Sequence, residues 1–483
     1  MSEQQVVSKD YASSFTIKSA AMWKVGDEDG DPYVNLGSMV PGSMLAQFQY
    51  YEDINWPSYG GTMVIIDNEE NVISTMPIQG WEKVVVDIED NNGGQYVYEF
   101  RVWNIFNRVN RDRKQTYTLG LISEYGLLNE GIRINKKIEG NTSLQVSEIL
   151  KEYLKVPEDL IDSEASSTTI KVLPTKKTPY SLIRSLLPKT ISEKTGNAIK
   201  ERQASYSRSN QSSSDVNTVE AEKATGTAGY FFFQTNRGFT FRSIDSLVST
   251  DETFNGNPPI GKPFVYNWSS EQEPSLYRIQ EIIFGQELNI LKKMRSGGYS
   301  SLTCYLNINT GQYEEQVYSL AEMWGDMAHL GNQSKLPFGQ EQLSEYPSRV
   351  MSSVINHENW YNGTQVASNE PQDGGKGDNS FPDFQKQYLA QGIARASILN
   401  NQKLTISLTG HLELCAGDKI EVLIPEQVSE EKRDEYWDPE YSGLYLIKNL
   451  NHQFTMSTPP SVYTVLDLVR DSYGSQDNES TIK

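Results

Sequence analysis

The sequence predicts a mixed β and α+β protein in which two β domains are separated by a small α/β domain. Strand-like alternation fills the first 140 residues, helical signals begin at Asn141, and alternation returns in the final third. The 483-residue chain has room for about two to four domains, and its 37% hydrophobic content is typical of globular proteins. No internal repeat of about 20–50 residues is visible.

The first β domain is expected at residues 12–140, as a sheet built of hairpins. In QYVYEFRVW and in QTYTLGLIS, large apolar residues alternate with other residues, which is typical of half-buried strands. The residues on the apolar faces are Tyr96, Tyr98, Phe100, Val102, Tyr117, Leu119 and Leu121. Between these strands, NIFNRVNRDRK is a basic turn in an acidic protein. It is either a solvated hairpin tip or a contact with another subunit.

The central α/β domain is expected at residues 141–248. The segment TSLQVSEILKEYL pairs Thr142 with Gln145 as a capping box ahead of an apolar helical stripe. A second helix is expected to begin at Thr178-Pro179 and to end before Pro188, because proline is favoured in the first helical turn. In GYFFFQTNRGFTFRSIDSL, two strands are joined by a turn at 236–238.

A polar insertion is expected at residues 201–229 of the central domain. It contains no Leu, Ile, Phe or Trp, so it cannot build a core, and we read it as a disordered segment. Deletion of Gln203 to Thr227 is therefore expected to leave the fold intact.

The second β domain is expected from two stretches, 249–319 and 385–472. Residues 320–384 interrupt them as an irregular insertion rich in Gly, Asn, Gln and Pro, and residues 473–483 form a polar tail. KLTISLTG, GDKIEVLIPE and SVYTVLDLVRDS are expected to be strands of this domain.

Two local signals lie inside the same region. A helix in ELNILKKM is expected to end at Gly297-Gly298, and the hairpin that follows is expected to turn at 309–311. The segment FPDFQKQYLAQGIARASILN is expected to be helical.

The formal charge of −20 argues against a protein that grips nucleic acid, because that affinity comes from Lys and Arg. An acidic wall can still surround DNA, since it repels phosphate, although solubility alone explains the same charge. No run of about 18 apolar residues is present, and Met1-Ser-Glu-Gln-Gln has no signal-peptide character, so no stable membrane association is expected. Cys304 and Cys415 are expected to be buried thiols in a reducing cytoplasm.

Two motifs imitate ligand sites. GNPPIGKP (256–263) has the spacing of a phosphate loop, but Pro263 replaces the hydroxyl residue and two inner prolines remove N–H donors, so we interpret it as a linker. GDEDGDP (26–32) bunches four carboxylates, but the glycine and glutamate of a calcium loop are missing, so we interpret it as a solvated turn.

The four histidines, His329, His357, His411 and His452, are scattered and form no metal motif. His452 shares a strand face with Leu450 and Phe454, which favours a structural histidine over a catalytic one. No nucleophile elbow occurs, and carboxylates are too common to single out a glycosidase pair. We therefore expect no catalytic residue, no cofactor-binding residue and no metal ligand, and we expect that the chain is not an enzyme.

Three C-terminal segments, GHLELCAGDKIEVLIPE, EYSGLYLIKNLNHQF and YTVLDLVRDS, carry a family resemblance. They resemble the C-terminal tube domain of baseplate hub proteins of contractile-tailed bacteriophages, a family shared with the N-terminal part of VgrG-type spikes. The Gly417-Asp418 turn and the Ser442-Gly443 step match the positions where the family begins strands, and glycine permits such tight turns. The resemblance covers about residues 12–472 and departs at the insertion 201–229.

The resemblance implies a fold of two β-barrel-like tube domains that form a trimeric, pseudo-hexameric ring. Such a hub adapts a hexameric tail tube to a trimeric spike and lines the DNA conduit without specific binding. The implied partners are two further copies, a central spike protein with an OB-type domain, and tail-tube initiator and baseplate wedge proteins. The implied location is the virion tail baseplate, after assembly in the host bacterial cytoplasm.

Two alternatives stay open at this point. A receptor- or glycan-binding tail protein is suggested by the 11% aromatic content and predicts an exposed aromatic groove. A tail-associated cell-wall hydrolase predicts clearing of cell wall, but no residues in the sequence support it.

Overall fold

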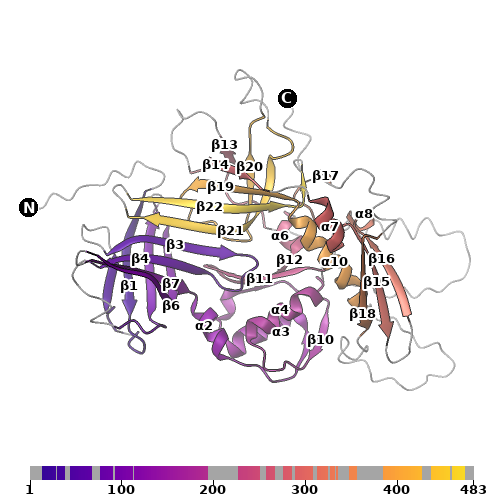
Figure 1. The fold of residues 1–483 in the computed structure, drawn as a ribbon, viewed down its shortest axis with the longest axis horizontal. Helices are drawn as coiled ribbons and strands as arrows, with labels where there is room; N and C mark the ends of the chain where they lie inside the picture. The colour runs from indigo at the N-terminus through magenta and orange to yellow at the C-terminus, as the bar shows by residue number, and fades with distance from the viewer. Residues whose placement is uncertain are drawn as a thin grey trace, which may run out of the picture.

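Thirteen of the described strands form one long sheet that ends in a barrel, and helices and smaller sheets lie beside it (Figure 1). The computed structural model describes residues 14–28, 30–37, 44–67, 77–90, 93–111, 114–193, 227–250, 257–266, 276–285, 289–307, 313–324, 327–331, 333–334, 347–355, 384–426, 437–456 and 460–473. Predictions that fall on other residues, such as the turn at 309–311, lie outside the described part of the chain.

The N-terminal part of the long sheet has the strand order β2-β1-β5-β6-β7-β4-β3. The strands are β1 (Phe15–Trp23), β2 (Val34–Gly37), β3 (Leu45–Asp53), β4 (Gly60–Asp67), β5 (Lys83–Asp90), β6 (Gln95–Arg111) and β7 (Lys114–Ile122). The predicted alternation is confirmed in β6, where Tyr98, Phe100 and Val102 are buried. The basic turn is the end of the β6–β7 hairpin, and β6 is exposed there from Asn107 to Arg111.

The C-terminal part is a closed barrel of six strands, β21-β20-β13-β14-β19-β22, which closes because β22 also pairs with β21. The strands are β13 (Phe264–Tyr266), β14 (Arg278–Phe284), β19 (Gln402–Thr409), β20 (Lys419–Leu423), β21 (Gly443–Thr455) and β22 (Ser461–Arg470). The mixed-β fold class with a barrel-like domain is therefore confirmed.

The two β parts are joined by an antiparallel pairing of β3 with β21, from Asp53 opposite Asn449 to Gln47 opposite Thr455. One hydrophobic core runs through both parts. Phe48 of β3 stacks on Phe454 of β21 with 5.4 Å between ring centroids. The first part is thus an open curved sheet that continues directly into the barrel wall.

The central α/β part lies below the long sheet in Figure 1. It contains α2 (Glu124–Gly131), β8 (Ile138–Asn141), α3 (Thr142–Tyr153), β9 (Ile161–Ser163), β10 (Thr169–Val172), α4 (Pro179–Leu186), β11 (Tyr230–Thr235), β12 (Gly238–Ser243) and α6 (Ile244–Val248), with 3-10 turns at Glu158–Leu160 and Leu187–Lys189. The predicted β11–β12 hairpin is confirmed, as is the α4 start, where the Thr178 side chain accepts from Ser181 N.

The predicted capping box of α3 is wrong by one residue. The N-cap is Asn141, whose side chain accepts a hydrogen bond from Ser143 N at 3.0 Å. Thr142 is fully buried and donates its hydroxyl to the carbonyl of Thr168 at 3.0 Å, so it is not available to cap the helix.

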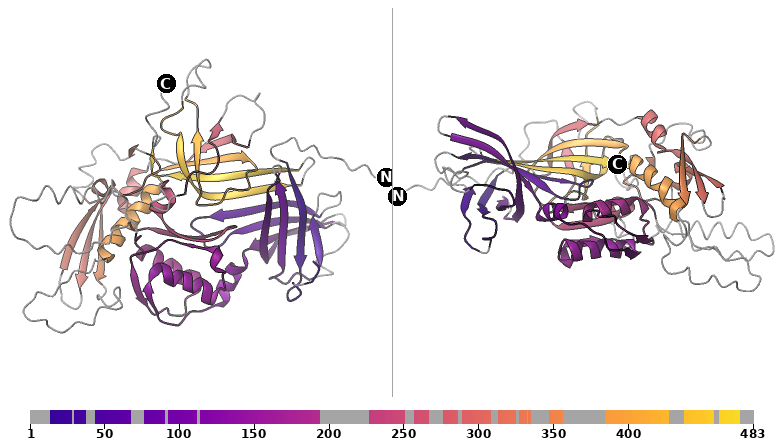
Figure 2. Two further views of the ribbon diagram at one scale, coloured as in Figure 1. Left: turned by 180° about the vertical axis from the view of Figure 1, so that it is seen from behind. Right: turned by 60° about the horizontal axis from the view of Figure 1, so that its bottom comes forward.

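A smaller unit lies at the end of the molecule opposite the N-terminal sheet (Figures 1 and 2). It contains α7 (Ile290–Ser296), β15 (Ser300–Asn307), β16 (Tyr313–Ser319), α8 (Leu320–Met323), β18 (Arg349–Ile355) and α10 (Phe384–Leu399). The helix end at Gly297, with a φ of 76°, and the helix in 384–399 are confirmed. Two short strands, β17 (Gln333–Ser334) and β23 (Ser472–Tyr473), pair with each other.

The β15–β16 hairpin does not join the barrel, in contrast to its expected place in the second β domain. The barrel is closed and offers no free edge, so β15 pairs instead with β18, in parallel register. β18 lies inside the stretch 320–384 that was expected to be irregular. The boundaries of the domains stay a prediction.

The expected insertion 201–229 is described only from residue 227 onward, and this end is packed into the fold. Thr227 and Ala228 are buried, and the Thr227 hydroxyl donates to Asp245. The backbone N–H of Ala228 donates to the Gln391 side chain at 3.0 Å. These contacts argue against a deletion that extends to Thr227, and the tolerance of the insertion to deletion stays a prediction.

Candidate functional site: the sheet face across the junction

The outward face of the long sheet crosses the β3–β21 junction without interruption. Its side chains form four rows that are set by the strand register of β19, β22, β21, β3 and β4. The rows are Thr405, Asp467, Asn449 and Asp53; Ser407, Val465, Asn451, Tyr51 and Gly60; Thr409, Tyr463, Gln453, Gln49 and Thr62; and Ser461, Thr455, Gln47 and Val64. We call these residues the polar face.

The polar face is nearly free of charge. Asp53 and Asp467 are its only charged side chains, and it contains no Lys or Arg. The Asp467 carboxylate accepts hydrogen bonds from Thr405 Oγ1 at 2.6 Å and from Asn449 Nδ2 at 3.0 Å. Amides and hydroxyls supply most of the remaining polar groups, so the face is hydrophilic without attracting ions strongly.

A groove of about 680 Å³ lies at one end of the polar face. Two indoles line it, Trp56 and Trp103, which are 57% and 55% exposed. A Cβ atom on Gly120 would lie 2.9 Å from Nε1 of Trp103, so the absence of a side chain at this position lets the indole lie on the sheet. None of the described lining residues is Lys, Arg or His, which makes the groove unsuited to an anionic ligand.

Directly behind the polar face, the buried carboxylate of Glu52 holds three parts of the chain together. Oε1 accepts from the hydroxyl of Tyr50 at 2.5 Å and from the backbone N–H of Asn236 at 2.9 Å, and Oε2 accepts from the N–H of Ala416 at 2.7 Å. Burial raises the pKa of Glu52 to about 7, although all three hydrogen bonds favour its charged form.

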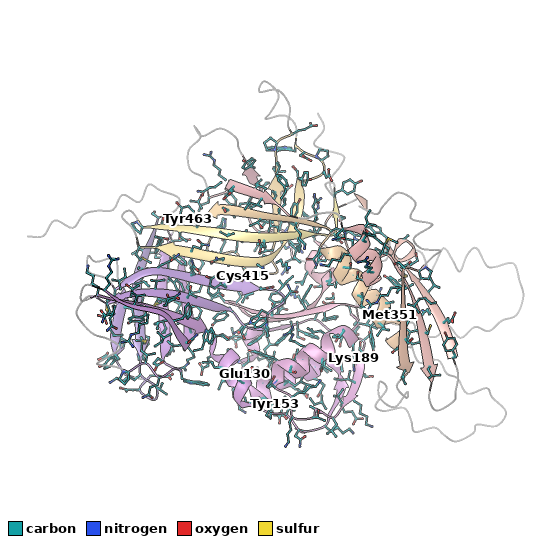
Figure 3. The ribbon with its side chains drawn as sticks, in the orientation of Figure 1. Glu130, Tyr153, Lys189, Met351, Cys415 and Tyr463 are labelled. Atoms are coloured by element: carbon teal, nitrogen blue, oxygen red, sulfur yellow. The ribbon has the colours of Figure 1, made fainter. Side chains whose placement is uncertain are left out.

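Cys415 lies beside this junction in the middle of the molecule (Figure 3). Burial raises the pKa of its thiol well above the usual value, and the predicted burial of Cys415 is confirmed. The same prediction is wrong for Cys304, which is only half buried.

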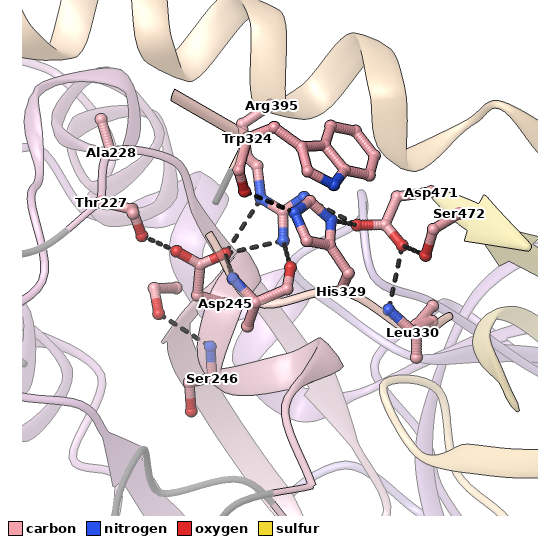
Figure 4. A network of polar contacts seen from close by, with 12 residues as sticks. Thr227, Ala228, Asp245, Ser246, Trp324, His329, Leu330, Arg395, Asp471 and Ser472 are labelled. Atoms are coloured by element: carbon pink, nitrogen blue, oxygen red, sulfur yellow. Dashed lines mark hydrogen bonds and ion pairs between the residues drawn. The ribbon is translucent and has the colours of Figure 1, made fainter. Parts of the chain in front are cut away.

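A second buried polar cluster ties the smaller unit to the barrel and the central part (Figure 4). Arg395 of α10 bonds Asp245 at 2.7 Å and Asp471 at 2.8 Å, and none of these three side chains is exposed. His329 Nδ1 lies 2.8 Å from the same carboxylate of Asp471. Although burial alone would raise it, the pKa of Asp471 is held well below its usual value by His329 and Arg395.

The other histidines that were considered from the sequence do not belong to the Glu52 cluster or to the Arg395 cluster. His452 is buried in the barrel wall, where its Nδ1 lies 2.8 Å from Thr464 Oγ1. Burial, with a smaller contribution from His411, lowers the pKa of His452 to about 3, so its imidazole is neutral. His411 is buried near Phe264 and Tyr277, and His357 lies outside the described residues.

The two ligand-like motifs have ordinary surroundings. Residues 257–263 form an irregular connection, and the N–H of Ile260 donates to the carbonyl of Lys419 at 2.8 Å. In the acidic turn at 26–32, Glu28 binds Arg101 through two ion-pair hydrogen bonds. No group of three metal-ligating side chains occurs in the part of the chain that is described.

No family model and no curated protein match the chain. Among solved structures, the tail protein of Neisseria meningitidis MC58 matches 95% of this chain and 97% of its own, with 10% identity and a TM-score of 0.47. The Francisella PdpA–VgrG complex matches 95% of this chain and 58% of its own, with 7% identity and a TM-score of 0.43. The 43 kDa tail protein of prophage MuSo2 from Shewanella oneidensis matches 95% of this chain and all of its own, with 10% identity and a TM-score of 0.51. The chain has the fold of a phage tail protein.

This phage tail fold confirms the family resemblance at the level of architecture. Sequence reasoning had selected the strands of the polar face, but it did not find their pairing across the junction, nor Glu52 and Arg395. An isolated arginine inside an apolar helical segment, as in GIARASIL, is the one local signal that pointed to the second cluster. Within the described residues, no helix of this tail fold is long and apolar enough to cross a membrane.

Proposed function

We propose that this chain is a structural hub subunit of a contractile phage tail baseplate. In this proposal three copies form a ring that adapts a hexameric tail tube to a trimeric spike and lines the DNA conduit. The observation that carries it is the polar face, a continuous wall without Lys or Arg that spans both β parts of one chain.

The β3–β21 pairing supports the pseudo-sixfold ring. Each chain supplies an open curved sheet and a barrel that share one wall, so three chains supply six β parts. Further edge-to-edge contacts between copies would protect the open edge strand β2, which otherwise invites aggregation.

The chemistry of the polar face suits a surface that DNA slides past. Tight DNA binding comes from Lys and Arg, which release counterions from phosphate, and the polar face has neither. Its amides and hydroxyls keep the wall wet, while the chain as a whole carries a charge of −20 that repels phosphate at longer range. The proposed conduit is therefore mostly uncharged at its surface, with Asp53 and Asp467 as the only charged side chains of the polar face.

The partners in this proposal are two further copies, a spike with an OB-type domain, a tube initiator and baseplate wedge proteins. The role is mechanical and not enzymatic, and it needs no cofactor. Assembly would take place in the host cytoplasm and the product would reside in the virion tail.

Electron microscopy of the purified protein tests whether it forms a ring. Cysteine labelling tests whether the polar face lines the bore of that ring. In Gln453→Cys, a small maleimide is expected to react in the assembled ring, whereas a polymer-linked maleimide too bulky for the bore reacts slowly. Glu152→Cys, on an exposed position of α3, is expected to react with both reagents. Particles without a central hole would contradict the hub function, and equal labelling of Gln453→Cys would place the polar face outside the ring.

The groove favours a second candidate function, glycan binding. Exposed indoles beside amides and carboxylates suit the apolar faces and hydroxyls of a neutral saccharide. A glycan array is expected to show binding that Trp56→Ala and Trp103→Ala each abolish, whereas Leu173→Ala, at an exposed position outside the groove, leaves it unchanged. No described feature favours the hydrolase alternative, which a cell-wall zymogram would detect.

A further inference from the structure

The three-stranded sheet β16-β15-β18 has one covered face and one open face. Ile290 and Met294 of α7 and Ile398 of α10 belong to the small core on the covered side, where Ser301, Thr303 and Tyr305 are buried. In the described part of the chain, no helix or strand packs against the opposite side, which lies toward the end of the molecule in Figure 1.

Strand register places nine side chains on the open face, in three rows across the three strands. The rows are Val317, Leu302 and Val350; Glu315, Cys304 and Ser352; and Tyr313, Leu306 and Val354. Both outer rows are apolar, and only the central row carries a charge. We call these nine residues the apolar face.

The apolar face leaves large hydrophobic side chains in water. Val350 is 64% exposed, and Tyr313, Val317, Val354 and Leu306 are 59%, 53%, 45% and 43% exposed. A contiguous patch of this kind on a folded protein marks an interaction surface, because exposed apolar area costs about 25 cal/mol per Å².

We propose that the apolar face packs against a second copy of this chain. The inference rests on the proposed ring, which needs an apolar contact between copies that the polar face cannot supply. Two copies that each carry a charge of −20 repel one another over most of their surfaces. The apolar face is a place where this repulsion is small, since Glu315 is its only charged residue and accepts a hydrogen bond from the Tyr313 hydroxyl at 2.6 Å.

The position of the apolar face also fits a ring. The face lies at one end of the protomer, opposite the N-terminal sheet (Figure 2). A surface at one end makes a contact with a different surface of the next copy, and such heterologous contacts are the ones that close rings of three. DNA is not a suitable occupant, because the face contains no Lys or Arg.

Sedimentation of the full chain over a wide range of concentrations tests the proposal. Val350→Glu combined with Val354→Glu is expected to weaken association of copies by at least about tenfold. The matched control is Leu144→Glu with Leu173→Glu, at positions 63% and 64% exposed in the central part, which is expected to leave association unchanged. Circular dichroism and thermal unfolding of each variant verify that the fold is retained. The conservative variant Val350→Ile with Val354→Ile keeps the apolar face and is expected to associate as the wild type does.

Three results would overturn the inference. If the variant Val350→Glu with Val354→Glu associates as strongly as the wild type, the ring stays possible but the apolar face is not one of its contacts. Loss of spike binding without loss of the ring would assign the face to the spike. A wild-type chain that stays monomeric throughout would also overturn it, and imaging of the chain with its spike would then decide separately whether the hub function survives.

Discussion

The carboxylate of Glu52 accepts a hydrogen bond at 2.7 Å from the backbone N–H of Ala416, 364 residues further along the chain. Glu52 ends the buried row of β3, and Ala416 precedes the turn that leads into β20. The same carboxylate holds Asn236 in the turn of the β11–β12 hairpin. A single buried acid therefore fixes the open sheet, the barrel and the central part relative to one another, directly behind the polar face.

We predict that stability falls as pH rises through the titration of Glu52. The folded-state pKa is about 7, raised from 4.5 by burial, so the folded protein binds the proton more tightly than the unfolded chain. The free energy of unfolding is therefore unaffected below the unfolded-state pKa. It falls as the pH rises, and above about pH 7 the loss reaches its full value of roughly 3 kcal/mol. Denaturant unfolding at about pH 5 and about pH 8 measures it.

Glu52→Gln is expected to remove most of this pH dependence, because the amide stays neutral at both values. Glu152→Gln, at a position 53% exposed, is the matched control and is expected to behave as wild type. An unchanged pH dependence in Glu52→Gln would assign the titration to another group.

Substitution of Gly417, in the turn that leads into β20, is predicted to lower the free energy of unfolding more than substitution of Gly93 or Gly131. Its φ is 89°, and a Cβ atom would lie 2.6 Å from Cζ of Phe233. Gly417→Ala is therefore expected to cost at least about 2 kcal/mol, because strain and a steric clash add. Gly93→Ala has a positive φ but open space and is expected to cost about 1 kcal/mol, while Gly131→Ala, with neither, is expected to cost less than about 0.5 kcal/mol. Equal unfolding free energies for the three variants would contradict this order.

Local signals predicted local structure well. The alternation around Phe100 follows from the two-residue period of a strand with one buried side, and Thr178 and Gly297 mark helix ends because their side chain and backbone satisfy end groups there. The capping of α3 was assigned one residue late, because Asn141 and Thr142 are both good caps in sequence and burial of Thr142 decides between them.

The pairings that create the polar face were not predictable in the same way. β3 and β21 are separated by almost the whole chain, and alternation fixes which side of each strand is buried but not which strand lies next to it. The same holds for β15, which has the pattern of a barrel strand but pairs with β18. Buried Arg395 has its partners, Asp245 and Asp471, on other elements, so its sequence neighbours give no hint of them.

Deletion of residues 203–226 is predicted to leave a soluble, folded protein. The sequence there contains no Leu, Ile, Phe or Trp, so little core is lost. Extending the deletion to 228 is expected to destabilise the fold by roughly 2–4 kcal/mol, since it removes the Thr227 hydroxyl from Asp245 and the Ala228 N–H from Gln391. Thermal unfolding compares the two proteins, and equal stability would show that residues 227–228 contribute nothing.

Arg395→Met is predicted to cost about 3–5 kcal/mol, because it leaves Asp245 and Asp471 buried without their main counter-charge. Adding Asp245→Asn is expected to recover part of the loss, since one uncompensated charge then disappears. Lys136→Met removes an ion pair with Glu152 whose side chains are 69% and 53% exposed, and it is expected to cost less than about 1 kcal/mol. Equilibrium unfolding in denaturant measures all three variants. A loss below about 1 kcal/mol for Arg395→Met would mean that water replaces the guanidinium and that the cluster does not hold the smaller unit to the barrel.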